Sequence, residues 1–183
     1  MSGEERVVLL DGEHRPAGTM PKADVHGTDT PLHLAFSVYV FDRAGRFLMT
    51  RRALSKRTWG GVWSNTCCGH PGPDEPVESA VRRRLAEELG LPVGELDVVL
   101  PDFSYRAVSP EGMVEHEVCP VFVAHTDGDP RPDPAEVVEW RWVEWSAFRT
   151  AAASTPWLLS PWSVLQAAQL PADLGQPPAV RER

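Results

Sequence analysis

The sequence has few cysteines, no long hydrophobic run and little positive charge. Its three cysteines, Cys67, Cys68 and Cys119, are an odd number without regular spacing, which excludes a disulfide framework. The N-terminal stretch MSGEERVVLLDGEH lacks the basic segment and apolar core of a secretory signal. Apolar runs such as LHLAFSVYVF are far shorter than the roughly 20 residues that cross a bilayer. We therefore expect a cytoplasmic protein without a membrane-spanning segment.

The charge balance is acidic, with a formal net charge of -8 at pH 7. Nucleic acids and anionic membranes require a positive field over a broad face, so we expect neither as a partner. At 183 residues the chain can bury one core, and it shows no second core and no fixed-period repeat. We expect one domain over residues 1–183, in which the proline-rich residues 171–183 form a frayed tail.

Hydrophobic periodicity and turn signals predict the order of the elements. Apolar runs predict strands at 6–10 and 137–145, and hairpins over 34–52 and 96–125. Two segments have the composition of loops, residues 19–31 and 54–65. Helices are predicted at 76–89, 145–152 and 161–169, and Gly90 ends the first of them. Strands on both sides of a central helix predict an α+β fold with a mixed β-sheet covered by helices.

Three histidines and two glutamates are the strongest candidate metal ligands. His26, His33 and His70 come from separate segments that can converge. Glu115 and Glu117 alternate on a predicted strand, so both carboxylates point to the same face. Such a set suits zinc, manganese or iron(II) better than calcium. The alternative is scattered histidines beside a solvated glutamate face, and no role is predicted for His14, His116 and His125.

The segment GHPGPDEPVESAVRRRLAEELGL, residues 69–91, carries a second pattern. Its spacing of Gly, Glu and Arg resembles the Nudix box, in which a loop and a helix supply carboxylates to a divalent cation that holds a diphosphate. Arg84 stands where that family has a glutamate, and this departure weakens a hydrolase interpretation. Without the resemblance, Arg83–Glu87 and Arg84–Glu88 are i,i+4 ion pairs that each stabilise a helix by about 0.3 to 0.5 kcal/mol.

Six ordered blocks resemble the type I isopentenyl-diphosphate isomerase family. These blocks are TPLHLAF, RRALSKRTWGGVWSN, CGHP, PDFSYRA, VEHEVCPVF and TPWLLSPW, and they span almost the whole chain. The resemblance implies a Nudix-type fold and an isomerase of isoprenoid biosynthesis that converts isopentenyl diphosphate to dimethylallyl diphosphate. It also implies that the partner is this small-molecule substrate.

The resemblance implies a role for one of the three cysteines and for one glutamate. In that family a cysteine directly before Gly-His-Pro and the second glutamate of a Glu-x-Glu pair are catalytic, and these positions are Cys68 and Glu117 here. Cys67 matches no functional position and is expected to be a small buried side chain. Cys119, two residues past Glu117, could lie near the site, but simple packing is the expectation.

Aromatic and metal-binding positions follow from the same resemblance. Trp162 matches the tryptophan that faces the substrate cation, and Tyr105 matches a tyrosine whose hydroxyl assists at the glutamate. One manganese or zinc ion would be bound by His26, His33, His70, Glu115 and Glu117. Core packing is expected for Trp140 and Trp142, while the roles of the other tryptophans, Trp59, Trp63, Trp145 and Trp157, stay open.

The diphosphate end of the substrate needs cations that grip it without promoting hydrolysis. Lys22, Arg52 and Lys56 match the family's phosphate-binding residues. Glu88 matches the helix carboxylate that holds a magnesium ion bridged to the diphosphate, close to the Cys68 segment. Arg84 is a further candidate phosphate cation. The remaining nearby arginines are expected to be solvated: Arg51, Arg57, Arg82 and Arg83.

Two other functions remain as alternatives at this point. A Nudix hydrolase of nucleoside or other diphosphates would depend on Glu87 and Glu88 but not on Cys68. A metal-binding or diphosphate-sensing module would keep the fold without turnover. The presence of both Cys68 and Glu117 favours the isomerase over either of them.

Overall fold

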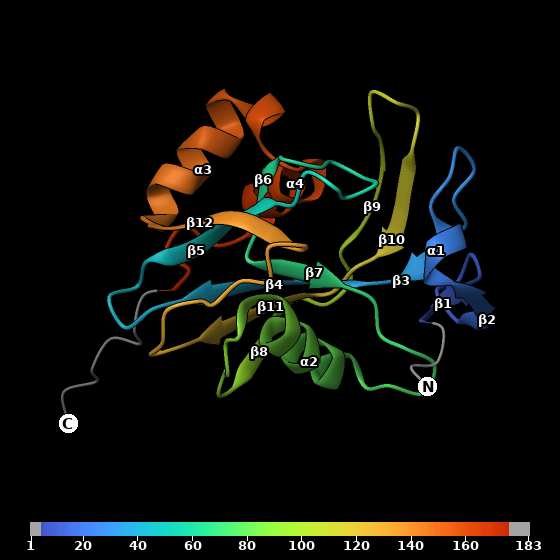
Figure 1. The fold of residues 1–183 in the computed structure, drawn as a ribbon, viewed down its shortest axis with the longest axis horizontal. Coiled ribbons are helices and arrows are strands. Elements are labelled where there is room, and N and C mark those ends of the chain that lie inside the picture. Colours follow the sequence, from blue (N-terminus) through green and yellow to red (C-terminus); the bar gives the residue numbers. More distant parts are fainter. Residues whose placement is uncertain (1–4, 176–183) are drawn as a thin grey trace.

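A mixed seven-stranded sheet forms the centre of the computed structural model, which describes residues 5–175 (Figure 1). Neighbouring strands β4 and β11 run parallel, and the other pairs are antiparallel. The order across the sheet is β12 (Val137–Val143), β5 (Phe47–Arg52), β4 (Phe36–Phe41), β11 (Val121–His125) and β8 (Leu96–Leu100). Two short strands join it, β6 (Trp63–Ser64) on β5 and β7 (Cys67–Gly69) on β4.

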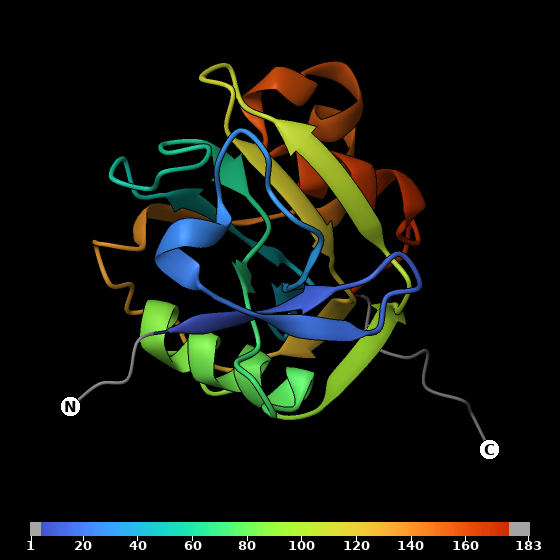
Figure 2. The same ribbon diagram turned by 90° about the vertical axis from the view of Figure 1, so that its right-hand side faces the viewer.

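A second sheet of five strands lies at one end of the first (Figure 1). Its order is β2 (Pro16–Pro21), β1 (Arg6–Leu10), β3 (His33–Leu34), β10 (Val114–Val118) and β9 (Ser104–Val108). The parallel register of β3 and β10 sets His33 directly beside Glu117. Figure 2 shows the β1–β2 hairpin crossing in front of β10, with the helix α1 (Lys22–Val25) beside it.

Helices cover both faces of the seven-stranded sheet. On one face lies α2 (Val77–Leu89), and on the other lie α3 (Trp145–Ser154) and α4 (Pro161–Gln169), linked by the short 3-10 helix η1 (Pro156–Leu158) (Figure 1). Because side chains alternate along a strand, β4 contributes Phe36, Val38 and Val40 to the core cluster under α2. Its residues Tyr39 and Phe41 belong to the cluster under α3 and α4. Both faces of this central strand are therefore buried.

The α+β prediction is confirmed, and several predicted elements match closely. The strand at 6–10 and the helix at 161–169 have the predicted bounds, and the long helix begins one residue late, at Val77. It ends at Gly90, whose φ of 60° is the left-handed conformation that glycine adopts at low cost. Within residues 5–175 no helix combines the length and apolar character needed to cross a membrane.

Two predictions of local structure were wrong in part. The expected loop at 19–31 contains the end of β2 and the helix α1, because pairing with β1 organises an exposed segment that has no apolar alternation. The expected hairpin over 96–125 is divided between the sheets. Its inner strands β9 and β10 pair in the five-stranded sheet, while β8 and β11 pair in the seven-stranded one. Pro101 and Pro120 stand at the two breaks, where a missing N–H ends the ladder.

The tail predicted to fray from Pro171 is packed over its first residues. The carbonyl oxygen of Pro171 accepts a 2.8 Å hydrogen bond from Trp145 Nε1, and Leu174 packs against the core cluster under α3 and α4. The rest of the predicted tail, residues 176–183, lies outside the described residues.

Candidate active site

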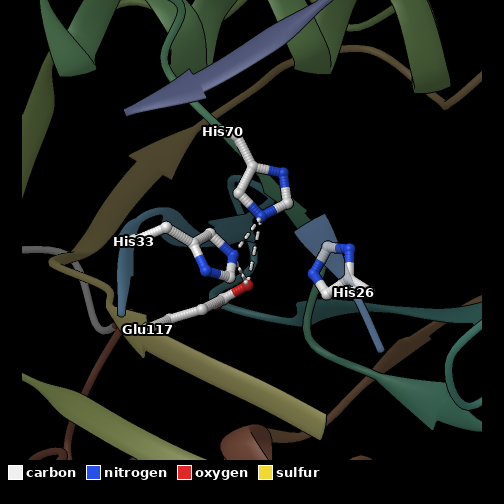
Figure 3. A group of neighbouring side chains, drawn as sticks. All are labelled: His26, His33, His70 and Glu117. Carbon is white, nitrogen blue, oxygen red and sulfur yellow. Dashed lines mark hydrogen bonds and ion pairs between the residues drawn. The ribbon is translucent and has the colours of Figure 1, made fainter. Parts of the chain in front are cut away.

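Four side chains from four segments meet at the junction of the two sheets. His26 follows α1, His33 begins β3, His70 follows β7 and Glu117 lies on β10. Figure 3 shows their side chains pointing toward one another. One ligand atom from each of the four lies within 4.8 Å of all the others, an arrangement that can hold a metal ion. The convergence that the sequence predicted for the three histidines is therefore present.

Short contacts hold this group together. Glu117 Oε1 lies 3.1 Å from His70 Nε2 and 3.5 Å from His33 Nε2, and the two histidine nitrogens are 3.3 Å apart. His33 Nδ1 is hydrogen-bonded to the carbonyl oxygen of Pro31 at 2.9 Å, which fixes the ring so that Nε2 faces the centre. Glu115 lies on the same strand face as Glu117, and its Oε2 is 2.9 Å from His26 Nε2.

The protonation states in this group are set by burial and by the neighbouring charges. Burial lowers the pKa of His70 to about 4, so its ring is neutral at pH 7. Burial opposes the charge on Glu117, but hydrogen bonds from His33 and His70 hold the pKa of this carboxyl well below its usual range. Burial and the nearby charge of Glu117 raise the pKa of Glu115. A neutral imidazole beside an ionised carboxylate is the state that metal ligation requires.

Unsatisfied polar atoms show what this centre is suited to bind. Among the described residues, His26 Nε2, His70 Nδ1 and Glu115 Oε2 are buried without a hydrogen-bond partner. The 2.9 Å contact between His26 and Glu115 does not have hydrogen-bond geometry. Leaving a buried donor or acceptor unpaired costs about 1 to 3 kcal/mol. His26 Nε2 and Glu115 Oε2 face each other without a hydrogen bond, and such a pair of an imidazole nitrogen and a carboxylate oxygen fits a divalent metal ion. His70 faces the centre through Nε2, and its Nδ1 points away (Figure 3).

Two groups capable of proton transfer line one cavity of about 420 Å³ together with this centre. Tyr105 donates a 2.9 Å hydrogen bond to Glu117 Oε2, the oxygen that does not face the histidines. Cys68 lies on the strand β7, where burial raises the pKa of its thiol to about 11. The thiol is therefore protonated at neutral pH. Trp162, on α4, also lines the cavity, and its ring lies 5.9 Å from that of Tyr105.

The adjacent cysteines point to opposite faces of the sheet. Cys67 belongs to the core cluster under α2, whereas Cys68 packs against the cluster under α3 and α4. This follows from the alternation of side chains along β7. Cys119 is buried, and its Sγ lies 3.4 Å from Ser37 Oγ, which is also 3.3 Å from Cys68 Sγ. The packing expected for Cys67 is observed, while Cys119 packs within reach of the candidate catalytic thiol.

Sequence reasoning missed three buried polar residues around Cys68: Ser37, Asn65 and Gln166. Asn65 Oδ1 accepts from the Cys68 thiol at 3.2 Å and from Trp162 Nε1 at 3.0 Å. Gln166 Nε2 donates to Ser37 Oγ at 2.9 Å. The available signal was a polar residue within a strongly apolar run, such as Ser37 in FSVYVF, because a buried polar side chain must find a partner.

Five basic residues also line this cavity and are called its cationic end below: Lys22, Arg52, Lys56, Arg57 and Arg84. Each is already engaged. Lys22 pairs with Glu5 at 2.7 Å, and Lys56 pairs with Glu136. The guanidinium of Arg52 bonds to the carbonyl oxygen of Thr58 and lies 5.2 Å over the Trp162 ring. Arg57, which was expected to be solvated, is exposed but donates to the carbonyl oxygen of Ala23.

Glu88 lies beneath this cationic end, on the last turn of α2. It is 5% exposed and accepts from Arg84 Nε at 2.9 Å, and Arg84 also contacts Glu87 and Glu136. Glu88 shares a small cavity with Lys56, Cys67 and Cys68. The proximity of Glu88 to the Cys68 segment therefore agrees with the expectation from the sequence, although its carboxylate is paired with Arg84.

The remaining singled-out residues lie outside this chemistry. The ligand group contains none of His14, His116 and His125 among the described residues. Trp140 and Trp142 pack against the cluster under α2, as expected. Trp145 is a core residue, Trp59 packs edge-on to Trp162, Trp63 is half-buried, and Trp157 is exposed. The other arginines are engaged at the surface: Arg51 with Gly61 and Glu139, Arg82 with Val93, and Arg83 with Glu75 and Glu87.

The chain is similar to known proteins in both sequence and fold. Residues 31–163 match the NUDIX domain, a range that excludes Lys22 and His26. A protein of Deinococcus radiodurans superposes with a TM-score of 0.71 at 17% identity, covering 90% of this chain and 98% of that protein. A MutT NUDIX hydrolase from Burkholderia pseudomallei superposes with a TM-score of 0.58 at 25% identity, covering 76% and 98%. The Nudix-type fold predicted from the sequence is thereby confirmed.

Two relatives share far more of the sequence, and both bear the name isopentenyl-diphosphate Delta-isomerase. The protein from Frankia alni is 63% identical over 163 residues, which cover 89% of this chain and 84% of the relative. The protein from Agromyces mediolanus is 55% identical over 170 residues, which cover 93% and 82%. In both comparisons the similarity therefore extends beyond the Nudix region and covers most of this chain and most of the relative.

Proposed function

The chain belongs to the Nudix family and, within it, to the isopentenyl-diphosphate Delta-isomerases, and from this premise we propose that Cys68 and Glu117 carry out its proton transfers. The enzyme converts isopentenyl diphosphate to dimethylallyl diphosphate. The double bond moves when a proton is added to the terminal methylene carbon and another is lost from the carbon next to the diphosphate-bearing methylene. Two proton-transfer groups must therefore reach one bound five-carbon unit.

The observation that carries this proposal is that a protonated thiol and a tyrosine-bound carboxylate line the same cavity. Cys68 and Glu117 reach that cavity from different sheets, β7 of the seven-stranded sheet and β10 of the five-stranded one. A substrate between them could receive a proton on one side and lose one on the other. Tyr105, bonded to the second oxygen of Glu117, would hold that carboxylate and assist transfer there.

The aromatic lining supports the cationic character of this reaction. Adding a proton to the alkene produces a tertiary carbocation, which loose water would trap. The Trp162 ring, with Tyr105 beside it, offers a π face that stabilises positive charge without attacking it. Trp162 is 3% exposed, so its ring is held by the protein and not by solvent. We propose that the Trp162 ring stabilises the carbocation.

The cations at the other end would bind the diphosphate. Lys22, Arg52, Lys56 and Arg84 line the cavity there, and charge-assisted hydrogen bonds to phosphate oxygens are among the strong polar contacts. Glu88 would hold the magnesium ion that bridges to the diphosphate, and Arg84 would then turn from Glu88 toward the phosphate. This exchange of partners is possible because Arg84 contacts both Glu88 and the cavity.

The His/Glu centre would hold one manganese or zinc ion through His26, His33, His70, Glu115 and Glu117. When bound, such an ion supplies positive charge that fixes the Glu117 carboxylate and tunes its acidity. The unsatisfied atoms of His26 and Glu115 support the inclusion of both residues. The protein itself positions Glu117 through the pairing of β3 with β10 and through the Tyr105 hydrogen bond.

The hydrolase alternative loses its support at Arg84. Nudix hydrolysis uses a cluster of helix carboxylates to hold metal ions and activate water, whereas here the guanidinium of Arg84 contacts both Glu87 and Glu88. A cation inside that cluster neutralises the charge that would attract additional metal ions.

We further propose that residues 1–183 form one domain that works in the cytoplasm and binds no nucleic acid.

The direct test uses isopentenyl diphosphate with magnesium in deuterated water. Proton spectra should show dimethylallyl methyl signals, deuterium should enter the five-carbon unit, and no phosphate should be released. Cys68→Ala and Glu117→Gln should each abolish this conversion, while Cys67→Ala, the matched control on the other face of β7, should retain most of it. An inactive but folded Cys67→Ala variant would contradict the assignment between the two cysteines.

A further inference from the structure

Asn65 connects two residues to which the proposed function gives separate roles. Its side chain is 1% exposed, and Oδ1 lies 3.2 Å from Cys68 Sγ and 3.0 Å from Trp162 Nε1. The indole N–H of Trp162 has no other acceptor among residues 5–175. Ser64 Oγ donates a third hydrogen bond to this oxygen at 2.9 Å, and Ser64 Oγ is also 2.8 Å from Ser160 Oγ. The oxygen of Asn65 is therefore shared by the thiol and the indole.

The orientation of the Asn65 amide is determined by its surroundings. Nδ2 donates to the backbone carbonyl oxygens of Val38 at 3.2 Å and Cys67 at 2.9 Å. Exchanging the oxygen and nitrogen would set an oxygen against these two carbonyls and an N–H against the indole N–H of Trp162. Each of these contacts would be repulsive. Oδ1 must therefore face Cys68 and Trp162.

The opposite side of the thiol is held by a second chain of hydrogen bonds. Tyr39 donates to Gln166 Oε1 at 2.9 Å, and Gln166 Nε2 donates to Ser37 Oγ at 2.9 Å. Ser37 must then direct its single proton to a sulfur atom, either Cys68 Sγ at 3.3 Å or Cys119 Sγ at 3.4 Å. The Cys68 thiol can thus accept from Ser37 while it donates to Asn65.

We propose that Asn65 is a positioning residue that holds the Cys68 thiol in register with the Trp162 ring through one shared acceptor oxygen. This inference rests on the proposed role of Cys68. In the proposed function the Trp162 ring faces the carbocation, and the Cys68 thiol exchanges a proton with the same five-carbon unit. These two groups must therefore keep a fixed separation. Asn65 supplies that constraint from the loop between β6 and β7, and the amide bonds to Val38 and Cys67 anchor it to the central sheet.

Asn65→Ala removes the shared acceptor and leaves every proposed diphosphate contact intact. We expect kcat to fall 10- to 100-fold while KM for isopentenyl diphosphate changes less than threefold. In a Cys67→Ala background, iodoacetamide labelling of Cys68 at pH 8 should become at least threefold faster, because the thiol loses the hydrogen bond that holds it in place and the truncated side chain leaves space beside it. Labelling of Cys119, read from a separate peptide by mass spectrometry, should stay slow. Unchanged kcat together with unchanged Cys68 labelling would overturn the proposal.

Ser163→Ala is the matched control. Ser163 is fully buried and adjacent to Trp162, but its hydroxyl contacts Ser160 alone among the described residues. This variant should stay within threefold of the unmodified enzyme. A loss as large as that of Asn65→Ala would show that any buried hydrogen bond beside Trp162 matters, and would overturn a specific role for Asn65.

A second measurement covers the case in which Asn65→Ala does not fold. In Cys68→Ala the indole N–H of Trp162 keeps Asn65 Oδ1 without competition from the thiol, so its proton resonance should shift from its position in the unmodified enzyme. An unchanged resonance would contradict the shared acceptor. Cys68→Ala is assayed in parallel. If it retained turnover, the proposed function of Cys68 would fail, whereas inactive Cys68→Ala beside fully active Asn65→Ala would sink only the positioning role.

Discussion

The two ends of the active-site cavity handle charge in opposite ways. At the His/Glu end, His26, His33, His70 and Glu117 converge, and buried atoms of His26 and Glu115 face each other without a hydrogen bond among the described residues. At the cationic end, Lys22, Lys56 and Arg84 are each paired with a carboxylate. The difference indicates that the first end can hold a metal ion, while the charges of the second are already balanced and would have to exchange partners in order to bind a diphosphate as proposed.

Energetics explain why the two arrangements coexist. The pairs of Lys22 with Glu5 and of Lys56 with Glu136 are partly open to solvent, and such pairs contribute only about 0 to 1 kcal/mol, so breaking them to receive phosphate oxygens costs little. The Arg84–Glu88 pair is buried, so releasing Arg84 requires another cation beside Glu88. Buried polar atoms without partners cost about 1 to 3 kcal/mol each, a penalty that a bound metal ion removes. The His/Glu end should therefore respond strongly to loss of its ion, and the cationic end should respond moderately to loss of any one charge.

The largest effect is expected from Glu117→Gln at the His/Glu end. The change removes the carboxylate that contacts His33, His70 and Tyr105. Turnover should therefore fall at least about a thousandfold, the middle of the 100- to 10,000-fold contribution that one acid–base group usually makes. Deuterium incorporation from solvent measures this loss. Glu88→Gln, at the other end, is the comparison variant and should raise the magnesium requirement more than it lowers the maximal rate.

Removing the metal should destabilise the protein through the His/Glu end alone. Binding at a free metal concentration 100 times the Kd stabilises a folded protein by about 2.7 kcal/mol. Exhaustive chelation should therefore lower the melting temperature by several degrees, and added manganese or zinc should restore it. Calorimetry with metal analysis checks this result. A His70→Gln variant should bind less metal and show a smaller shift, and an equal shift in both proteins would contradict the assignment of the site.

The pH dependence of stability should also arise at the His/Glu end. Burial holds the pKa of His70 at about 4, below its value of 6.5 in an unfolded chain. The unfolded state therefore binds a proton first as the pH falls, and stability is full above pH 6.5 and decreases toward pH 4. One pKa unit corresponds to about 1.4 kcal/mol, so the total change for metal-free protein is about 3 kcal/mol. Urea titrations of metal-free protein at pH 7 and 5 measure it, and His70→Gln should show a weaker dependence.

A smaller effect is expected from Lys56→Met at the cationic end. Burial lowers the pKa of Lys56, which lies near Glu88 and pairs with Glu136. When Lys56 is lost, Lys22, Arg52 and Arg84 still line the cavity. A charge-assisted hydrogen bond contributes about 1.5 kcal/mol, which corresponds to a roughly tenfold rise in KM with little change in kcat. Steady-state kinetics test this. Arg43→Ala, which removes an exposed arginine paired with Asp127 far from the cavity lining, should leave KM unchanged.

The smallest effect is expected from Cys67→Ala, which changes the side of β7 that neither end of the cavity uses for chemistry. Cys67 packs under α2, so its truncation should lower the unfolding free energy by about 1 kcal/mol. Activity should stay within threefold of the unmodified enzyme. Denaturant titration and the isomerase assay measure the two quantities. A loss of activity without a loss of stability would show that Cys67 reaches the chemistry.

The sequence by itself determined the local elements and the candidates for the reacting groups. The 3.6-residue period and Gly90 located α2, and the Nudix-like spacing with the CGHP and VEHEV blocks identified Cys68 and Glu117 as candidates. Alternation along a strand already implied that Glu115 and Glu117 share a face. These features could be predicted because they depend on neighbours within a few residues.

Only the tertiary structure decided how distant segments combine. The division of residues 96–125 between two sheets, the pairing of His33 with Glu117 and the sharing of Asn65 Oδ1 by Cys68 and Trp162 all join segments far apart in the chain. Periodicity does not encode such pairings, because they depend on which buried polar groups can satisfy one another once the strands and helices have packed. The sequence thus specified the candidate reacting residues, and the packing of two sheets determined where they meet.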